Sequence, residues 1–220
     1  MAYLNWRRFF IFACAVSTAG LAFGQVSPEL SLYGVKLRNN FELKECAISK
    51  FAAQSPAGKI ISPGEKYNNP SAGHPPCFRH RLYENKANPE LESNAVVSIA
   101  WPLGEGPKIA SHPAASVLVL DGVVHRVWIF THGFDLQDRD VELLSEKFGT
   151  PTSRSVVGFQ NRFGAKFQGI SAKWDFGGAT LAFDGMYDGL NSGIVVLETS
   201  EGAAAYKARL NRSAQSGPKM

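Results

Sequence analysis

The residues best suited to chemistry lie in one short segment, His74-Pro-Pro-Cys77-Phe-Arg-His80, with a second cysteine, Cys46, upstream. Imidazole and thiolate groups are the usual ligands of zinc, so these two histidines and two cysteines form a candidate four-ligand set. Against a metal site, the Pro-Pro pair stiffens the chain after His74, and an extended segment would place His74, Cys77 and His80 on alternating faces. A disulfide between Cys46 and Cys77 is the competing interpretation, and we favour it.

A second polar group, His132 with Asp135, follows an apolar run and has the composition of an acid–base pair. Loops at strand ends commonly carry such residues. The acidic set that follows stands at the start of a predicted helix, where it suits the positive end of the helix dipole: Asp135, Asp138, Asp140 and Glu142.

The sequence lacks Gly-x-Ser-x-Gly, P-loop, His-Glu-x-x-His and dinucleotide fingerprints. We therefore expect no catalytic residues, no bound metal and no cofactor. A hydrolase or metal-dependent enzyme that uses His74 with His80, or His132 with Asp135, is the alternative.

A third candidate is an aromatic binding surface. Trp128 shares one face of a predicted strand with Arg126 and Phe130. Large amphipathic side chains serve cores and binding hot spots alike. Because the face that carries Trp174 is wholly apolar, we expect that residue in the core, and we expect Trp128, Arg126 and Phe130 to form the binding surface.

The first 24 residues have the features of a secretory signal peptide. Arg7 and Arg8 form a basic n-region, an apolar h-region follows over residues 9–23, and Ala22-Phe23-Gly24 is a small-x-small cleavage site. The apolar run is short for a membrane span of roughly 20 residues. We therefore expect cleavage before Gln25 and no stable span in the mature chain, with an uncleaved anchor as the alternative.

Export with cleavage of the signal would place the cysteines in an oxidising compartment and would lower the net charge of the mature chain. Two cysteines remain after cleavage, and in a periplasmic or secreted chain they are expected to form one disulfide. Closing a loop of about 30 residues stabilises the fold by roughly 3 kcal/mol. The net charge falls from +4 to +2 because Arg7 and Arg8 leave with the signal. So small an excess gives no support to nucleic-acid binding.

Two hairpins are predicted to build the sheet. Asp121-Gly122 is typical of a type I′ turn between apolar strands at 117–120 and 123–130, and a regular register pairs Leu118 with His125. Gly177-Gly178 joins a second pair of alternating strands and places Trp174 opposite Leu181 on a buried face.

The other elements are predicted from turn residues and periodicity. Asn39 or Asn40 caps the first helix, Asp135 or Asp138 caps the second, and Thr199 or Ser200 caps the third. The predicted ranges are strands 35–37, 77–83, 95–101 and 194–197, helices 41–51, 138–148 and 200–210, a loop over 53–76 and a polar turn over 84–94.

These elements predict an α+β fold in which an antiparallel β-sheet of hairpins, or meander, packs against two or three helices. Residues 25–132 and 133–212 are interpreted as two related halves, each beginning with a helix and continuing with tryptophan-bearing strands. Residues 213–220 are interpreted as a disordered basic tail.

The second half resembles the small outer-membrane assembly lipoproteins and the β-lactamase-inhibitor-protein-like domains. The resemblance rests on a helix ending in Glu-Lys-Phe-Gly-Thr-Pro (146–151), followed by the Trp174 strand and the Gly-Gly hairpin. It implies an envelope binding or inhibitor module without an active site. The lipidation cysteine of the lipoproteins is absent after the signal. We therefore expect an exported soluble protein whose partner is a protein or other envelope component.

Overall fold

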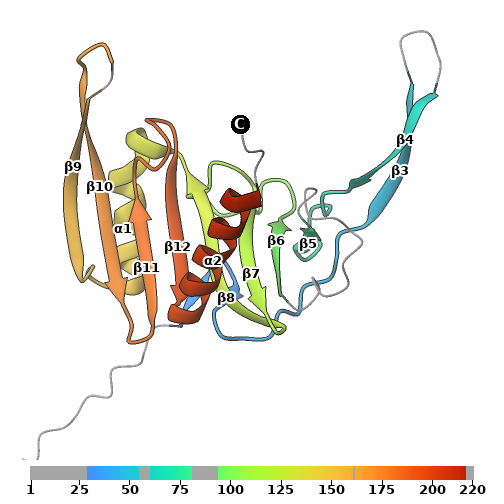
Figure 1. The fold of residues 1–220 in the computed structure, drawn as a ribbon, viewed down its shortest axis with the longest axis horizontal. Helices are drawn as coiled ribbons and strands as arrows, with labels where there is room; N and C mark the ends of the chain where they lie inside the picture. Colours follow the sequence, from blue (N-terminus) through green and yellow to red (C-terminus); the bar gives the residue numbers. More distant parts are fainter. Residues whose placement is uncertain (1–28, 55–59, 81–93, 161, 217–220) are drawn as a thin grey trace, which may run out of the picture.

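The computed structural model describes residues 29–54, 60–80, 94–160 and 162–216 (Figure 1). Its main element is an eight-stranded antiparallel sheet with the strand order β5-β6-β7-β8-β12-β11-β10-β9. The predicted signal peptide lies outside the described residues. The strands are β5 (Cys77–His80), β6 (Asn94–Ala100), β7 (Ala114–Leu120), β8 (Val123–Thr131), β9 (Ser153–Gln160), β10 (Lys166–Asp175), β11 (Ala179–Asp184) and β12 (Gly193–Thr199).

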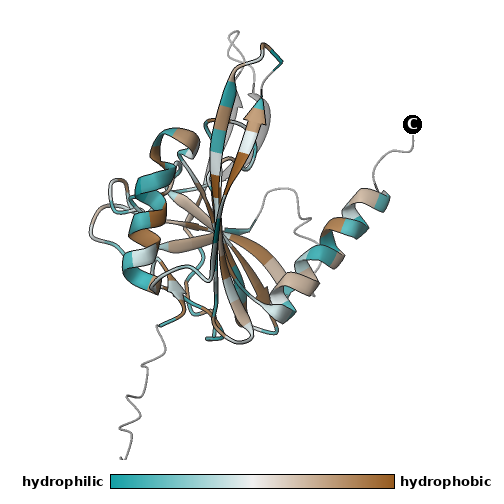
Figure 2. Ribbon diagram, turned by 90° about the vertical axis from the view of Figure 1, so that its left-hand side faces the viewer, coloured by the Kyte–Doolittle hydropathy of each residue, from teal (hydrophilic) through white to brown (hydrophobic). Residues whose placement is uncertain are grey.

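Two helices cover opposite faces of this sheet, as Figure 2 shows with the sheet seen edge on. Helix α1 (Gln137–Phe148) follows a 3-10 turn, η2 (Gly133–Leu136), and α2 (Ser200–Ser216) follows β12. The predicted α+β class, an antiparallel sheet packed against helices, is confirmed. Among the described residues, no helix is long and apolar enough to span a membrane.

The larger core lies on the α1 side of the sheet. The predicted stripe of α1, Val141, Leu144 and Phe148, is buried there against side chains from both predicted halves. The halves are not separate sheets, because β8 pairs with β12. The second half begins with α1 and continues with β9 to β12, as predicted, whereas the predicted helix at the start of the first half is absent from its described residues.

The two predicted hairpins are present. Asp121 and Gly122 have φ values of 49° and 77°, as a type I′ turn requires, and Leu120 pairs with Val123. The predicted partner of Leu118 is wrong, because the register shifts between Leu118 and Val119. A β-bulge on β8 adds one residue, and Leu118 therefore pairs with Arg126 instead of His125.

The glycine hairpin has the predicted register throughout. Gly177 and Gly178 have φ values of 67° and 93°, and Trp174 pairs with Leu181. Trp174 is 1% exposed, and its Nε1 donates a hydrogen bond to the carbonyl oxygen of Gly149, 2.6 Å away. Because Gly149 ends α1, this bond ties the end of the helix to the core strand.

The predicted helix at 41–51 is wrong. Phe41 and Leu43 pack against the core from an extended segment, where residues two apart share a face. The backbone of this segment forms hydrogen bonds with β5 instead of the bonds within a helix. Cys46 N donates to Phe78 O (2.8 Å), and Phe78 N donates to Lys44 O (2.9 Å).

The predicted loop at 53–76 contains a strand. β3 (Ile48–Gln54) and β4 (Ile60–Tyr67) pair as a two-stranded arm that projects from the main body (Figure 1). Pro63 is accommodated because both strands of such an arm are edge strands. A further small hairpin joins β1 (Ser31–Leu32) to β2 (Val35–Lys36).

The predictions for the helix caps and for the C-terminal tail are correct in part. Thr199 Oγ1 accepts from Gly202 N at 2.9 Å, which confirms the predicted cap of α2. No acidic side chain caps α1, whose N-cap is Leu136, because η2 leads directly into it. Helix α2 continues to Ser216, so the predicted disordered tail is helical in part. Residues 81–93, with the end of the predicted strand 77–83 and the polar turn, lie outside the described residues.

Candidate functional site

The structure joins Cys46 and Cys77 in the predicted disulfide, with an S–S distance of 2.00 Å and a Cα–Cα distance of 4.9 Å. Neither sulfur is then a thiolate available to zinc. His80 Nε2 lies 3.9 Å from Glu45 Oε1, and its ring packs edge-on against Phe78. Within the described ranges, no group of three or more His, Cys, Asp or Glu residues is placed to hold a metal ion.

The second predicted pair, His132 with Asp135, lies between β8 and α1. Both side chains are exposed. The buried acid of this region is Asp140, which is 1% exposed and which the sequence pattern relates only to the helix dipole. Burial raises the pKa of Asp140 to about 6, although His132, Thr131 and Arg139 lower it. His80 and His132 also lie apart: His80 is on β5 and His132 follows β8, and β6 and β7 lie between these two strands.

The third predicted surface is largely covered. Trp128 is 3% exposed, with the ring of Tyr206 from α2 centred 5.1 Å away. The Arg126 guanidinium packs over the Tyr206 ring at 4.2 Å and pairs with Glu198. The prediction that Trp128 is an exposed anchor is therefore wrong, because α2 covers this apolar face. Phe130 alone of the three keeps substantial exposure, at 37%.

Exposed apolar side chains gather instead on β9, the outermost strand beside β10 (Figure 1). All eight residues of β9 are exposed. Val156 is 58% exposed, Val157 is 43% exposed and Phe159 is 37% exposed. Phe163, in the turn that follows, is 82% exposed. An edge strand that exposes several large apolar side chains is unusual.

The two edges of the sheet differ in their protection. The outer side of β5 is covered by residues 44–46, through the hydrogen bonds given above. No described strand pairs with the outer side of β9. In an antiparallel ladder, alternate residues direct their N–H and C=O groups to the same side, so β9 presents a row of backbone donors and acceptors.

The register with β10 fixes which face each β9 side chain occupies. Val156 pairs with the core residue Ile170 and therefore lies on the α1 side. Val157 and Phe159 lie on the α2 side. Phe159 packs closely over Gly169, where a Cβ atom on that glycine would come within 2.8 Å of the Phe159 ring. The strand therefore offers apolar side chains on both faces, around a backbone edge.

Two further aromatic pairs lie on or near the sheet. Phe167, on β10 next to β9, makes an edge-to-face contact with Phe134, with centroids 5.8 Å apart. Phe130 and Tyr187 lie 6.2 Å apart, and β10, β11 and β12 separate the strand of Phe130 from β9. Tyr187 is 57% exposed. Such rings bury a large area at low entropic cost when a partner covers them.

The hairpin of β9 and β10 is also basic. Residues 153–175 contain one acidic side chain, Asp175, and four basic ones: Arg154, Arg162, Lys166 and Lys173. Arg154 Nη2 lies 3.6 Å from Asp138 Oδ1 on α1, and both side chains are largely exposed.

Sequence reasoning missed this edge because residues 153–160 lack the alternation of a half-buried strand. The only local signal is the short run Val156-Val157-Gly158-Phe159. No protein-family model, no curated protein and no solved structure matches the chain. The resemblance of the second half to envelope lipoproteins and inhibitor domains therefore stays a prediction.

Proposed function

We propose that this chain is an exported, non-catalytic binding module of inhibitor type that adds an extended segment of its partner to the free edge of β9. The observation that carries the proposal is the eight-residue edge strand, exposed throughout and unpaired with any described strand on its outer side.

Strand addition uses groups that β9 already presents. Main-chain hydrogen bonds to an added strand supply affinity, and side chains on alternating faces supply selectivity. Val156 on one face, with Val157 and Phe159 on the other, would each lose exposed apolar surface on pairing. Natural proteins usually block such an edge with a covering segment, as residues 44–46 do at β5.

The charge of the hairpin selects the kind of partner. The four basic side chains of the hairpin outnumber its one acidic side chain, Asp175, and this excess favours a strand that carries carboxylates. A second copy of this chain is disfavoured, because antiparallel pairing of two β9 strands would bring two basic hairpins together. We therefore favour an acidic extended segment of another protein.

The compartment is part of the proposal. The Cys46–Cys77 disulfide supports an oxidising environment, and the predicted signal peptide supports delivery to the periplasm or the exterior. The partner would then be an envelope or secreted protein. Mass spectrometry of the exported chain should find Gln25 as the first residue.

A pair of synthetic strands tests the proposal. Fluorescein-labelled (Glu-Val)4 should bind the mature chain with a saturable change in anisotropy, and (Lys-Val)4 should bind at least about tenfold more weakly, a difference of roughly 1.4 kcal/mol. Val157→Glu should weaken (Glu-Val)4 by a similar factor, because it places a carboxylate on the edge.

Leu210→Glu is the matched control, since Leu210 is 52% exposed on α2 and its replacement introduces the same charge away from β9. It should leave the affinity unchanged. Equal binding of the two peptides, or equal losses in the two variants, would show that β9 is not the binding edge.

A further inference from the structure

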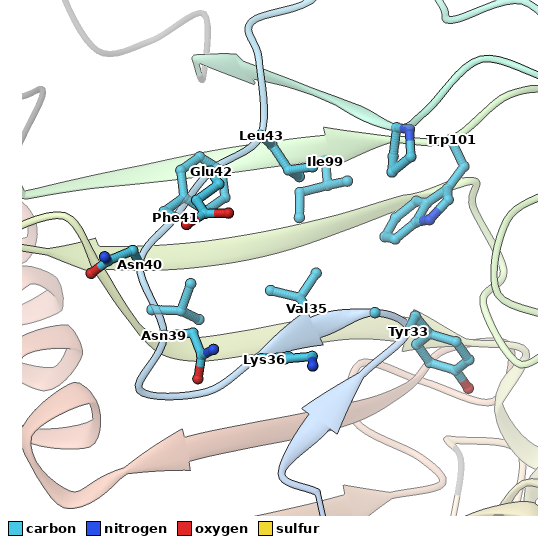
Figure 3. Close-up of a pocket in the computed structure, with 13 residues that line it drawn as sticks. Tyr33, Val35, Lys36, Asn39, Asn40, Phe41, Glu42, Leu43, Ile99 and Trp101 are labelled. Carbon is cyan, nitrogen blue, oxygen red and sulfur yellow. The ribbon is translucent and has the colours of Figure 1, made fainter.

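A cavity of about 600 Å³ lies between the β1–β2 turn, α1 and residues 101–109. It is independent of the β9 edge. A second cavity, of about 540 Å³, adjoins it, and Tyr33 and Trp101 line both. Figure 3 shows the second cavity, with Tyr33 and Trp101 together at one end and Val35 and Ile99 further along. Volumes in this range suit small-molecule ligands.

The floor of the larger cavity is apolar. Leu32, Ile109 and Leu144 are each at most 3% exposed, and Phe148 closes the same wall. Aliphatic and aromatic walls of this kind favour the alkyl part of a ligand, since they offer it no hydrogen-bonding groups.

The rim of the larger cavity is basic. Lys108, Arg139 and Lys147 line it, against one acid, Glu105. The Glu105 carboxylate already accepts a hydrogen bond from Gly73 N at 2.9 Å. Lys147 Nζ donates to the carbonyl oxygen of Ser31 at 2.7 Å. Neither Lys108 nor Arg139 forms an ion pair within 4.0 Å with an acidic group in the described part of the chain.

The residue between the two cavities is conformationally unusual. Tyr33 has a φ of 53° in the β1–β2 turn, a region that bulky residues rarely occupy. Asparagine or glycine is the usual choice at such a turn position. Strain of this kind persists where the surrounding structure holds it, often at ligand sites. Here it places a tyrosine ring on the wall that both cavities share.

From the apolar floor, the basic rim and the shared Tyr33 wall, we infer that the larger cavity binds a single-chain amphiphile with a carboxylate head, of the fatty-acid class. The alkyl chain lies against Leu32, Ile109 and Leu144, and it extends past Tyr33 toward the second cavity as it lengthens. The head group meets Lys108 and Arg139, because a guanidinium matches the two oxygens of a carboxylate.

Calorimetric titration with octanoate, decanoate and dodecanoate, each below its micelle concentration, tests this inference. Each added methylene should raise the affinity about fourfold, from the roughly 0.8 kcal/mol gained per buried CH₂. The double variant Lys108→Gln/Arg139→Gln should bind decanoate about tenfold more weakly and bind 1-decanol as the native chain does. Lys207→Gln, an exposed site on α2, should change neither.

Nuclear magnetic resonance locates the bound ligand, and a comparison with vesicles distinguishes a monomeric fatty acid from a membrane surface. On addition of decanoate to the native chain, the Trp101 indole N–H signal should shift, and those of Trp128 and Trp174 should not. The inference is overturned if decyltrimethylammonium binds as well as decanoate, if the double variant keeps full affinity, or if the Trp101 signal stays in place. Binding to phosphatidylglycerol vesicles without binding of monomeric decanoate would also overturn it, in favour of a membrane surface.

Discussion

Replacing the buried carboxyl of Asp140 by an amide should change how stability depends on pH. Asp140 lies in the first turn of α1, is 1% exposed, and has one oxygen, Oδ2, without a hydrogen-bond partner among the described residues. Burial is the largest cause of its raised pKa. Asp140→Asn keeps the shape of the neutral acid and removes its titration.

The sign of the effect follows from the direction of the shift. The pKa of Asp140 is about 6 in the folded chain and 3.8 as the reference value, so between these values the folded state holds the proton and the unfolded state releases it. Stability from this group is therefore complete below pH ~4 and is lost as the pH rises through about 6. At 1.36 kcal/mol per pKa unit, the loss is at most about 3 kcal/mol.

Urea denaturation of the native chain and Asp140→Asn, at intervals from pH 4 to pH 8, measures the difference directly. The two chains should have similar free energies of unfolding at pH 4, and the variant should be more stable at pH 8. Asp135→Asn, an exposed acid just before α1, is the control and should follow the native chain. A constant difference across the range would refute the assignment of a raised pKa to Asp140.

Three further predictions concern packing and use the same denaturation assay. Trp174→Ala and Trp128→Ala should each cost roughly 3–5 kcal/mol, because both rings are buried, and a native-like midpoint for either would contradict its place in the core. The double variant Cys46→Ala/Cys77→Ala should lose about 3 kcal/mol, and an unchanged midpoint would deny the disulfide a stabilising role. Gly202→Ala should cost about 1–3 kcal/mol through overpacking, since its Cβ would lie 2.3 Å from the backbone oxygen of His125; full stability would show that α2 is not docked there.

The parts of the fold that the sequence predicts well are those with a local cause. Asp121-Gly122 and Gly177-Gly178 adopt the positive φ values that their turns need, and the turns then set the strand register. Helix α1 follows from the spacing of its buried residues and from Gly149 at its end. These features depend on neighbours in the chain.

The wrong predictions depend on distant partners. Phe41 and Leu43 lie on an extended segment because β5 supplies its backbone hydrogen bonds. Trp128 is buried because α2, more than 70 residues later in the chain, crosses its face.

The candidate edge could not be seen in the sequence for a related reason. Strand β9 has no buried face, so it carries no alternating pattern. Its exposed position arises because β10 pairs with it on one side and no described strand pairs with it on the other. The excess of basic residues over residues 153–175 can be read from the sequence, but only the structure shows that these residues lie at a free edge of the sheet.

Hydrogen–deuterium exchange of residues 153–160 tests the central proposal most directly. In the free chain, the outward amides of β9 should exchange rapidly, because water is their only partner on that side. Saturation with (Glu-Val)4 should slow exchange at least tenfold in the proteolytic fragment that contains residues 153–160, and exchange in α2 should stay unchanged. Protection confined to α2 or to residues 105–109, with β9 exchanging as before, would contradict strand addition at this edge.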